Sequence, residues 1–310
     1  MAREPQEHFF IPSPREGLNL FLRHLPPAHA MPGAPRAVLY VHGATFPSAL
    51  SIAHPLDGRS WQDDLAAAGF HVWGLDFLGF GNSGRYPEMM QPAHGHAAPG
   101  RAREASEQIH RAVRFITGQQ GIPRVSIVAH SWGTIAAGLF ATRHPDALDR
   151  LVLFGPVTRR TGPPATARLP AWRDVTLQQQ WDRFIEDVPQ GLAPPFDRKH
   201  FDEWGALYLD SDPGSRERSP ASVRIPNGPI EDISAAWSGD LAYDPRLIRA
   251  PTAIIRGEWD GVVTDADARW LFDGLQASLL KRDVKIGHAT HLMHLESGRH
   301  ELHRATRDFL

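Results

Sequence analysis

The stretch Val125–Ala137 constrains the fold of this chain more than any other. It reads Val-Ser-Ile-Val-Ala-His-Ser-Trp-Gly-Thr-Ile-Ala-Ala, a β-branched run followed by a run rich in alanine. The first half is typical of a buried strand and the second of a buried helix. Ser131 therefore falls on a sharp strand-to-helix turn, where its hydroxyl would project from the sheet and its neighbours must be small. An ordinary helix N-cap is the alternative interpretation of Ser131.

The rest of the chain alternates short apolar runs with helix-length segments, which predicts crossover connections and a mostly parallel sheet. Uninterrupted apolar runs such as Val38–Val41 predict strands that are buried on both faces. We expect strands at Phe9–Ile11, Leu18–His24, Ala37–Val41, His71–Asp76, Arg124–Ala129, Leu151–Gly155, Thr252–Arg256 and Val284–Ile286. We expect helices at Ser60–Ala68, Ala102–Thr117, Ser131–Arg143, Ala266–Leu275 and Glu301–Phe309.

Residues 157–247 interrupt this alternation. They hold 11 of the 27 prolines and four of the nine tryptophans, and we find no run typical of a strand among them. Short helices broken by proline and carrying large aromatic side chains predict a mainly helical lid, inserted into a core made of residues 1–156 and 248–310. The alternative is a loop-rich insertion whose tryptophans pack only against one another.

Charge and cysteine content exclude several classes of protein. The 33 Lys and Arg against 35 Asp and Glu give a net charge of −2, which argues against a nucleic-acid binder. Without cysteine the chain has no disulfide, thiolate zinc site, iron–sulfur cluster or cysteine nucleophile. Met1–Phe10 matches neither a secretion signal nor a membrane anchor, so we expect a cytoplasmic protein that does not bind membranes.

Four further motifs follow expected strands. They are His42-Gly43-Ala44-Thr45, the segment Asp76–Ser83, the segment Arg256–Asp260, and Gly287–Glu296. In this order, together with Ala129-His130-Ser131-Trp132-Gly133, they resemble the α/β-hydrolase fold family, with Ala129 in place of the first glycine of its Gly-x-Ser-x-Gly elbow. The resemblance implies an eight-stranded, mostly parallel sheet flanked by helices, with the lid inserted after the sixth strand.

A serine hydroxyl needs a base within hydrogen-bond reach and a carboxylate to orient that base. The chain order of this fold is serine, acid, histidine. The resemblance places the acid at Asp260, the end of Gly-Glu-Trp-Asp, with Glu258 and Asp265 as competitors.

The base is chosen among three histidines spaced three residues apart. His291 matches the family's His-x-x-x-x-Glu pattern with Glu296, and His288 is the alternative. A metal site formed by His288, His291 and His294 is a rival interpretation, but their spacing does not give a His-Glu-x-x-His helix. We therefore expect no metal and no cofactor.

Further site residues follow from the same resemblance. The backbone amides of Ala44 and Trp132 are the expected oxyanion donors, and Phe46, His130 and Trp259 are the expected walls of the substrate pocket. His42 and Asp76 are expected to brace loops rather than to take part in chemistry.

These residues predict a serine hydrolase acting on a small-molecule carboxylic ester or lactone. A prolyl-aminopeptidase-like enzyme, with Glu186, Glu203 or Glu231 binding a substrate amino group, or a C–C bond hydrolase could use the same triad. A catalytically silent ligand-binding protein is the alternative from another class, although such proteins often lose a triad residue.

Overall fold

The structure, a computed structural model, describes residues 6–29, 33–163 and 168–310. The first five residues of the N-terminal segment Met1–Phe10, and positions 164–167 of the expected lid, lie outside the described residues.

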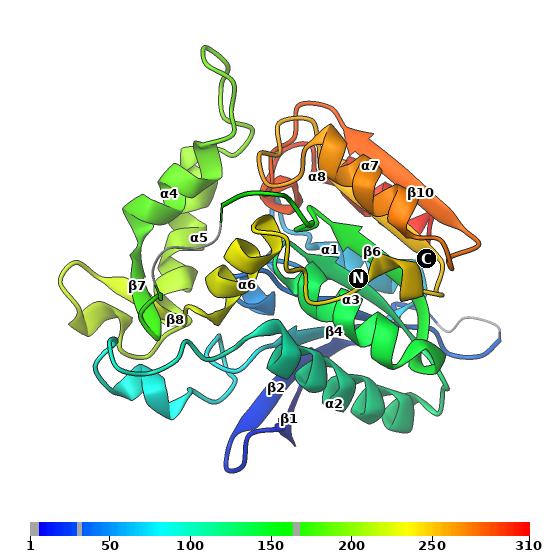
Figure 1. Cartoon of the computed structure of the whole chain (residues 1–310), viewed down its shortest axis with the longest axis horizontal. Helices are drawn as coiled ribbons and strands as arrows, with labels where there is room; N and C mark the ends of the chain where they lie inside the picture. The colour runs from blue at the N-terminus through cyan, green and yellow to red at the C-terminus, as the bar shows by residue number, and fades with distance from the viewer. Residues whose placement is uncertain (1–5, 30–32, 164–167) are drawn as a thin grey trace.

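Eight strands form one sheet in the order β1-β2-β4-β3-β5-β6-β9-β10 (Figure 1). The six strands from β4 to β10 in this order are parallel, and β1 and β2 are antiparallel at one edge. This confirms the expected mostly parallel sheet of eight strands. The strands are β1 (Glu7–Pro12), β2 (Asn19–Leu25), β3 (Ala37–Val41), β4 (His71–Asp76), β5 (Val125–His130), β6 (Leu148–Phe154), β9 (Thr252–Gly257) and β10 (Lys281–Ile286).

Helices cover both faces of the sheet because its central strands are apolar on both sides. Leu39 and Val41 of β3 belong to the core cluster under α2, α3 and α7, whereas Val38 and Tyr40 belong to the cluster under α1 and α8. Figure 1 shows α2 and α3 side by side across one face. The five helices are α1 (Trp61–Ala67), α2 (Ala102–Gln120), α3 (Gly133–Arg143), α7 (Asp265–Gly274) and α8 (Arg299–Arg307).

Residues 157–247, here called the inserted segment, leave the sheet after β6 and return at β9, its parallel neighbour. The described part contains β7 (Trp172–Thr176), α4 (Leu177–Ile185), α5 (Arg198–Asp210), β8 (Ser222–Pro226) and α6 (Gly228–Trp237). Figure 1 shows these elements gathered at one side of the main sheet.

The expectation that the inserted segment has no strand was wrong. The strands β7 and β8 form a separate antiparallel pair in which Asp174 lies opposite Arg224. The guanidinium of Arg224 donates to both carboxylate oxygens of Asp174, at 2.9 and 3.0 Å. Each of the two strands carries one residue of this charged pair, so they lack the apolar run by which the core strands are found in the sequence.

The tryptophans of the inserted segment do more than pack against one another. Trp181 stacks edge-on against Phe201 within the segment. Trp204 is fully buried, donates its indole N–H to the carbonyl of Leu50 at 2.9 Å, and packs edge-on against Phe46 of the core. The segment is therefore fastened to the core through an aromatic contact.

None of the helices in the described ranges combines the length and apolar character needed to cross a bilayer. The charge-free stretch Val125–Thr142 forms β5 and most of α3. The expected cytoplasmic location stays a prediction.

Candidate active site

Ser131 lies on the turn between β5 and α3 and has a positive φ of 55°. Few residues other than glycine adopt this conformation, and it is held here by hydrogen bonds on both sides. The Ser131 N–H donates to the carbonyl of Phe154 at 3.0 Å, and its carbonyl accepts from the amide and hydroxyl of Thr134 at 2.9 and 2.5 Å. The turn thus fixes the serine hydroxyl at the carboxyl edge of the sheet.

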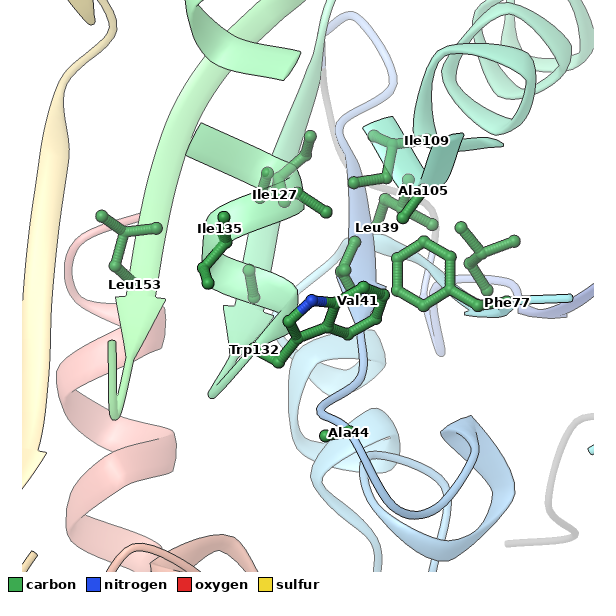
Figure 2. Packing of buried hydrophobic residues seen from close by; sticks show 14 of the residues in the cluster. Leu39, Val41, Ala44, Phe77, Ala105, Ile109, Ile127, Trp132, Ile135 and Leu153 are labelled. Atoms are coloured by element: carbon green, nitrogen blue, oxygen red, sulfur yellow. The ribbon is translucent and has the colours of Figure 1, made fainter. Parts of the chain in front are cut away.

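The loop after β3 passes directly against this turn. A methyl group at position 133 would lie 2.3 Å from the carbonyl oxygen of His42, so only glycine fits there. Figure 2 shows the indole of Trp132 packed among Val41, Phe77 and Ile135. The close approach places the loop that carries Ala44 beside the first turn of α3.

Ser131, His291 and Asp260 form a continuous hydrogen-bonded chain. His291 Nε2 lies 2.8 Å from Ser131 Oγ, and His291 Nδ1 lies 3.0 Å from both carboxylate oxygens of Asp260. Asp260 also accepts hydrogen bonds from the backbone amides of Val262 and Val263. Because a carboxylate only accepts, Nδ1 donates to Asp260, which leaves Nε2 free to accept the serine proton.

Gly155, at the end of β6, makes room for this imidazole. It has a φ of 53°, and a methyl group there would lie 2.9 Å from two atoms of the His291 ring. It would also lie 3.2 Å from a carboxylate oxygen of Asp260. The packing of the triad therefore requires glycine after β6.

The other histidines and acids considered from the sequence lie elsewhere. His288 is exposed, and its amide donates to Glu258 at 2.9 Å. His294 is buried beneath the triad, with its ring 4.7 Å from that of His130. Asp265 pairs with Arg256 and Lys285.

Two side chains hold the loops around the site. His42 Nδ1 lies 2.7 Å from the carbonyl of Gly43, and its Nε2 accepts from the amide of Phe77 at 3.1 Å. Burial lowers the pKa of His42, in agreement with a neutral ring that donates at one nitrogen and accepts at the other. The Asp76 carboxylate accepts from the amides of Ser48 and Asn82 at 2.9 and 3.1 Å.

His130 supports the loop that carries the base. Its ring stacks on Phe154 at 4.4 Å, and its Nε2 donates to the carbonyl of His291 at 3.0 Å. Burial, reinforced by the neighbouring imidazoles of His294 and His291, holds the pKa of His130 well below its ordinary value. A neutral His130 is the form that keeps this hydrogen bond without placing a second charge beside the triad.

Glu296 holds the same loop from the other side. Its carboxylate accepts from the amide of Thr290 at 3.2 Å and from the Thr290 hydroxyl. Burial raises the pKa of Glu296 to about 7, and the negative charges of Asp260 and Asp187 add to the shift. The His-x-x-x-x-Glu spacing thus joins the residue before His291 to a buried acid.

A cavity of about 270 Å³ opens onto Ser131 and His291. Phe46 and His130, two of the expected pocket walls, line it, and so does Ala44, which is expected to be an oxyanion donor. Trp259 does not line it, so its placement in the pocket wall was wrong. The Trp259 amide donates to the carbonyl of Ala289 at 2.9 Å, and its indole stacks on the ring of His288 instead.

One wall of the cavity comes from α6, whose residues were not predicted from the sequence to belong to the site. Ile230, Ile233, Ser234 and Trp237 all line the cavity. Their spacing of i, i+3, i+4 and i+7 places them on one face of a helix. This periodicity was a signal in the sequence, but the same pattern occurs wherever a helix covers a core.

A charged pair from the inserted segment also reaches the cavity. Arg183, on α4, and Glu186, which follows α4, line it and form an ion pair with each other. Asp187 lies 3.8 Å from the same guanidinium. The side chain of Glu186 is half exposed, so this pair borders solvent, where an ion pair contributes little stability.

Two groups of side chains in the described part of the chain could hold a metal ion, and both lie outside the cavity. They are Asp64, His300 and His303, and Glu107, His110 and His144. The absence of a cofactor stays a prediction.

Comparison with known families and proteins gives one strong match. The family model described as alpha/beta hydrolase fold matches residues 36–297, which contain the elbow, Asp260 and His291. None of the curated proteins compared with the chain matches it.

Solved structures share the fold over almost the whole chain at low sequence identity. A serine hydrolase involved in carbazole degradation is 18% identical with a TM-score of 0.65, and 98% of each chain is covered. The thioesterase domain from the curacin biosynthetic pathway is 16% identical with a TM-score of 0.63, covering 98% of this chain and 99% of that one. The enol-lactonase from Burkholderia xenovorans LB400 is 16% identical with a TM-score of 0.58, with coverage of 95% and 97%.

Proposed function

The chain belongs to the α/β-hydrolase fold family, and from that membership and the site geometry we propose that it is a serine hydrolase. Its proposed substrate is a small to medium, largely apolar carboxylic ester or lactone. The observation that carries the proposal is the hydrogen-bonded chain from Ser131 through His291 to Asp260, at 2.8 and 3.0 Å, which opens onto a cavity.

The proposed reaction proceeds through an acyl-enzyme. Ser131 Oγ attacks the acyl carbon while His291 Nε2 takes its proton, and Asp260 stabilises the imidazolium that forms. The tetrahedral intermediate collapses, and His291 returns the proton to the leaving alcohol. A water molecule, deprotonated by His291, then attacks the acyl-enzyme and releases the acid and the free serine.

The backbone amides of Ala44 and Trp132 are the proposed oxyanion donors. Ala44 lines the cavity beside Ser131, and Trp132 directly precedes α3, whose N-terminus favours negative charge. Loss of one such donor typically lowers turnover on the order of 10²–10³-fold.

The cavity lining supports an apolar substrate. Ile230, Ile233 and Trp237 of α6 line the cavity together with Phe46 and Leu292 of the core. We propose that the inserted segment is a lid that covers the acyl or alcohol part of the substrate. An enol-lactonase and a thioesterase domain are among the similar folds, which agrees with chemistry at an acyl carbon.

A panel of p-nitrophenyl esters, lactones, thioesters and prolyl amides in one plate tests the substrate class. We expect turnover of esters or lactones by the wild type and its loss in Ser131→Ala. Activity that persists in Ser131→Ala would contradict the proposal.

An amide substrate with a free amino group is the second candidate, favoured by the position of Glu186 in the cavity. Its carboxylate could bind an ammonium group, as the prolyl-aminopeptidase-like alternative requires. Faster turnover of prolyl amides than of esters, lost in Glu186→Gln, would select it. The intact triad counts against a silent binding protein.

A further inference from the structure

We propose that Trp237 is the wall that limits the length of the substrate, so that the wild-type cavity accepts short acyl esters and excludes long ones. The inference rests on the proposed function and deepens it by giving the substrate a size class. Trp237 is the last residue of α6 and lines the cavity that contains Ser131.

A second hollow, of about 400 Å³, is also lined by this side chain. Trp237 and Ser234 line both spaces, and Arg160, Gly162, Pro163 and Ser238 complete the lining of the second. Trp237 therefore borders both the catalytic cavity and further room that an alkyl chain could occupy.

The indole is held in place from the side of the second hollow. The guanidinium of Arg160 lies over the Trp237 ring at 4.7 Å and is itself bound to the Asp267 carboxylate at 2.6 and 3.1 Å. The backbone carbonyl of Trp237 accepts from the amide of Gly162 at 2.7 Å. These contacts hold the side chain as a fixed partition.

The helix that carries Trp237 is also anchored beneath the elbow. Asp232 faces away from the cavity and is buried, and its carboxylate accepts from the indole N–H of Trp132 at 3.0 Å. It also accepts from the amide of Ala102 at 2.6 Å and from Arg101 at 2.5 Å. Trp132 follows Ser131, so α6 is tied to the residue next to the nucleophile, and the wall keeps a constant distance from the reacting atoms.

The size of the cavity gives the substrate class. Its volume of about 270 Å³ is below the ~300–1,000 Å³ typical of sites for drug-sized ligands. Each further methylene that finds an apolar site gains about 0.8 kcal/mol, which is about fourfold in binding. Because Trp237 blocks the way, the methylenes of a long acyl chain do not gain this binding free energy.

The test is the chain-length profile of kcat/KM on p-nitrophenyl acetate, butyrate, hexanoate and octanoate. For the wild type we expect a preference for the short esters. Trp237→Ala should raise the ratio of octanoate to butyrate at least about tenfold, since four further methylenes gain apolar surroundings. Trp181→Ala is the matched control, because Trp181 lies in the same inserted segment, packs on Phe201 and lines neither space, and it should keep the wild-type order.

Trp237→Leu provides a second, milder opening should Trp237→Ala fail to fold, with folding checked by circular dichroism. A folded variant at position 237 with the wild-type profile would overturn the inference, as would an equal shift in Trp181→Ala. Neither result would contradict the proposed function. The proposed function fails only if the wild type hydrolyses no acyl substrate or hydrolyses one without Ser131. In that case the inference fails with it.

Discussion

The core wall and the inserted wall of the catalytic cavity differ in how their side chains are held. On the core side, Ser131, Asp260 and His291 follow the carboxyl ends of parallel strands and are fixed by backbone hydrogen bonds and close packing. On the other side, α6 presents one helical face of apolar side chains. The difference indicates that the sheet positions the catalytic residues, whereas the inserted segment determines the size and shape of the substrates that can bind.

The two walls meet at Asp232. This buried carboxylate joins α6 to the Trp132 indole and to the start of α2, and its burial raises its pKa despite three hydrogen-bonded neighbours. A change in the core wall should therefore lower turnover of all substrates alike, and a change in the inserted wall should alter the choice among them.

The largest effect is expected from the base. His291→Ala should lower kcat by at least about 10⁴-fold, because the serine loses its proton acceptor. His288→Ala is the matched control and should leave kcat within about twofold, since His288 is exposed and stacks on Trp259. Steady-state kinetics on the best ester measures both. If His288→Ala alone abolished acyl-enzyme formation, the assignment of His291 as the catalytic base would be wrong.

A second large effect is expected from Gly155→Ala, whose new methyl group would press on the His291 ring. We predict a loss on the order of 10²-fold in kcat, because small misplacements of reacting groups have effects of that size. Gly121→Ala is the control, since Gly121 has a similar φ of 63° and nothing within 4 Å of the added methyl. Both variants adopt the same unfavourable backbone conformation. Equal kcat values for the two would show that the packing against His291 has no catalytic role.

A smaller effect is expected where the two walls are joined. Asp232→Ala removes the acceptor shared by Trp132, Ala102 and Arg101, so we predict about a tenfold loss of kcat/KM and a loss of about 1–3 kcal/mol in unfolding free energy. Glu231→Gln is the control, because Glu231 also pairs with Arg101 but does not contact Trp132. Kinetics and urea unfolding of both variants measure the difference. A loss of stability with unchanged kcat/KM would limit Asp232 to a structural role.

The smallest effect on turnover is expected from Glu296→Gln, which should act on stability. The folded-state pKa of Glu296 is about 7, above the ordinary value of 4.5, so its contribution to stability is present below about pH 4.5 and lost as the pH rises through about 7. The glutamine side chain does not ionise, so the variant does not lose stability over this pH range. Relative to the wild type it should gain up to about 3 kcal/mol between about pH 5 and pH 9, measured by urea unfolding. A parallel pH dependence of the two proteins would contradict the raised pKa.

The sequence predicted the core wall because its signals are local. The run before Ser131 and the order of serine, acid and histidine each mark a strand end, and parallel strands bring such ends to one edge. The sequence could not choose between His288 and His291 from the residues alone, because which imidazole faces Ser131 depends on the turn at residues 287–291.

The inserted wall was less predictable for physical reasons. The strands β7 and β8 carry a charged cross-strand pair, Asp174 with Arg224, in place of an apolar run. The spacing from Ile230 to Trp237 is that of any helix on a core. Trp259 was misplaced because adjacency to Asp260 in the chain does not fix the direction of the side chain. The contact of Asp232 with Trp132 joins residues 100 positions apart and has no local signature.

The most direct test of the central claim, that Ser131 is an activated nucleophile, is to treat the wild-type protein with a fluorophosphonate probe and map the adduct by mass spectrometry. We predict one adduct, on Ser131, that forms much more slowly in His291→Ala and does not form in Ser131→Ala. A wild-type protein that stays unlabelled, or that is labelled at another residue, would contradict the account.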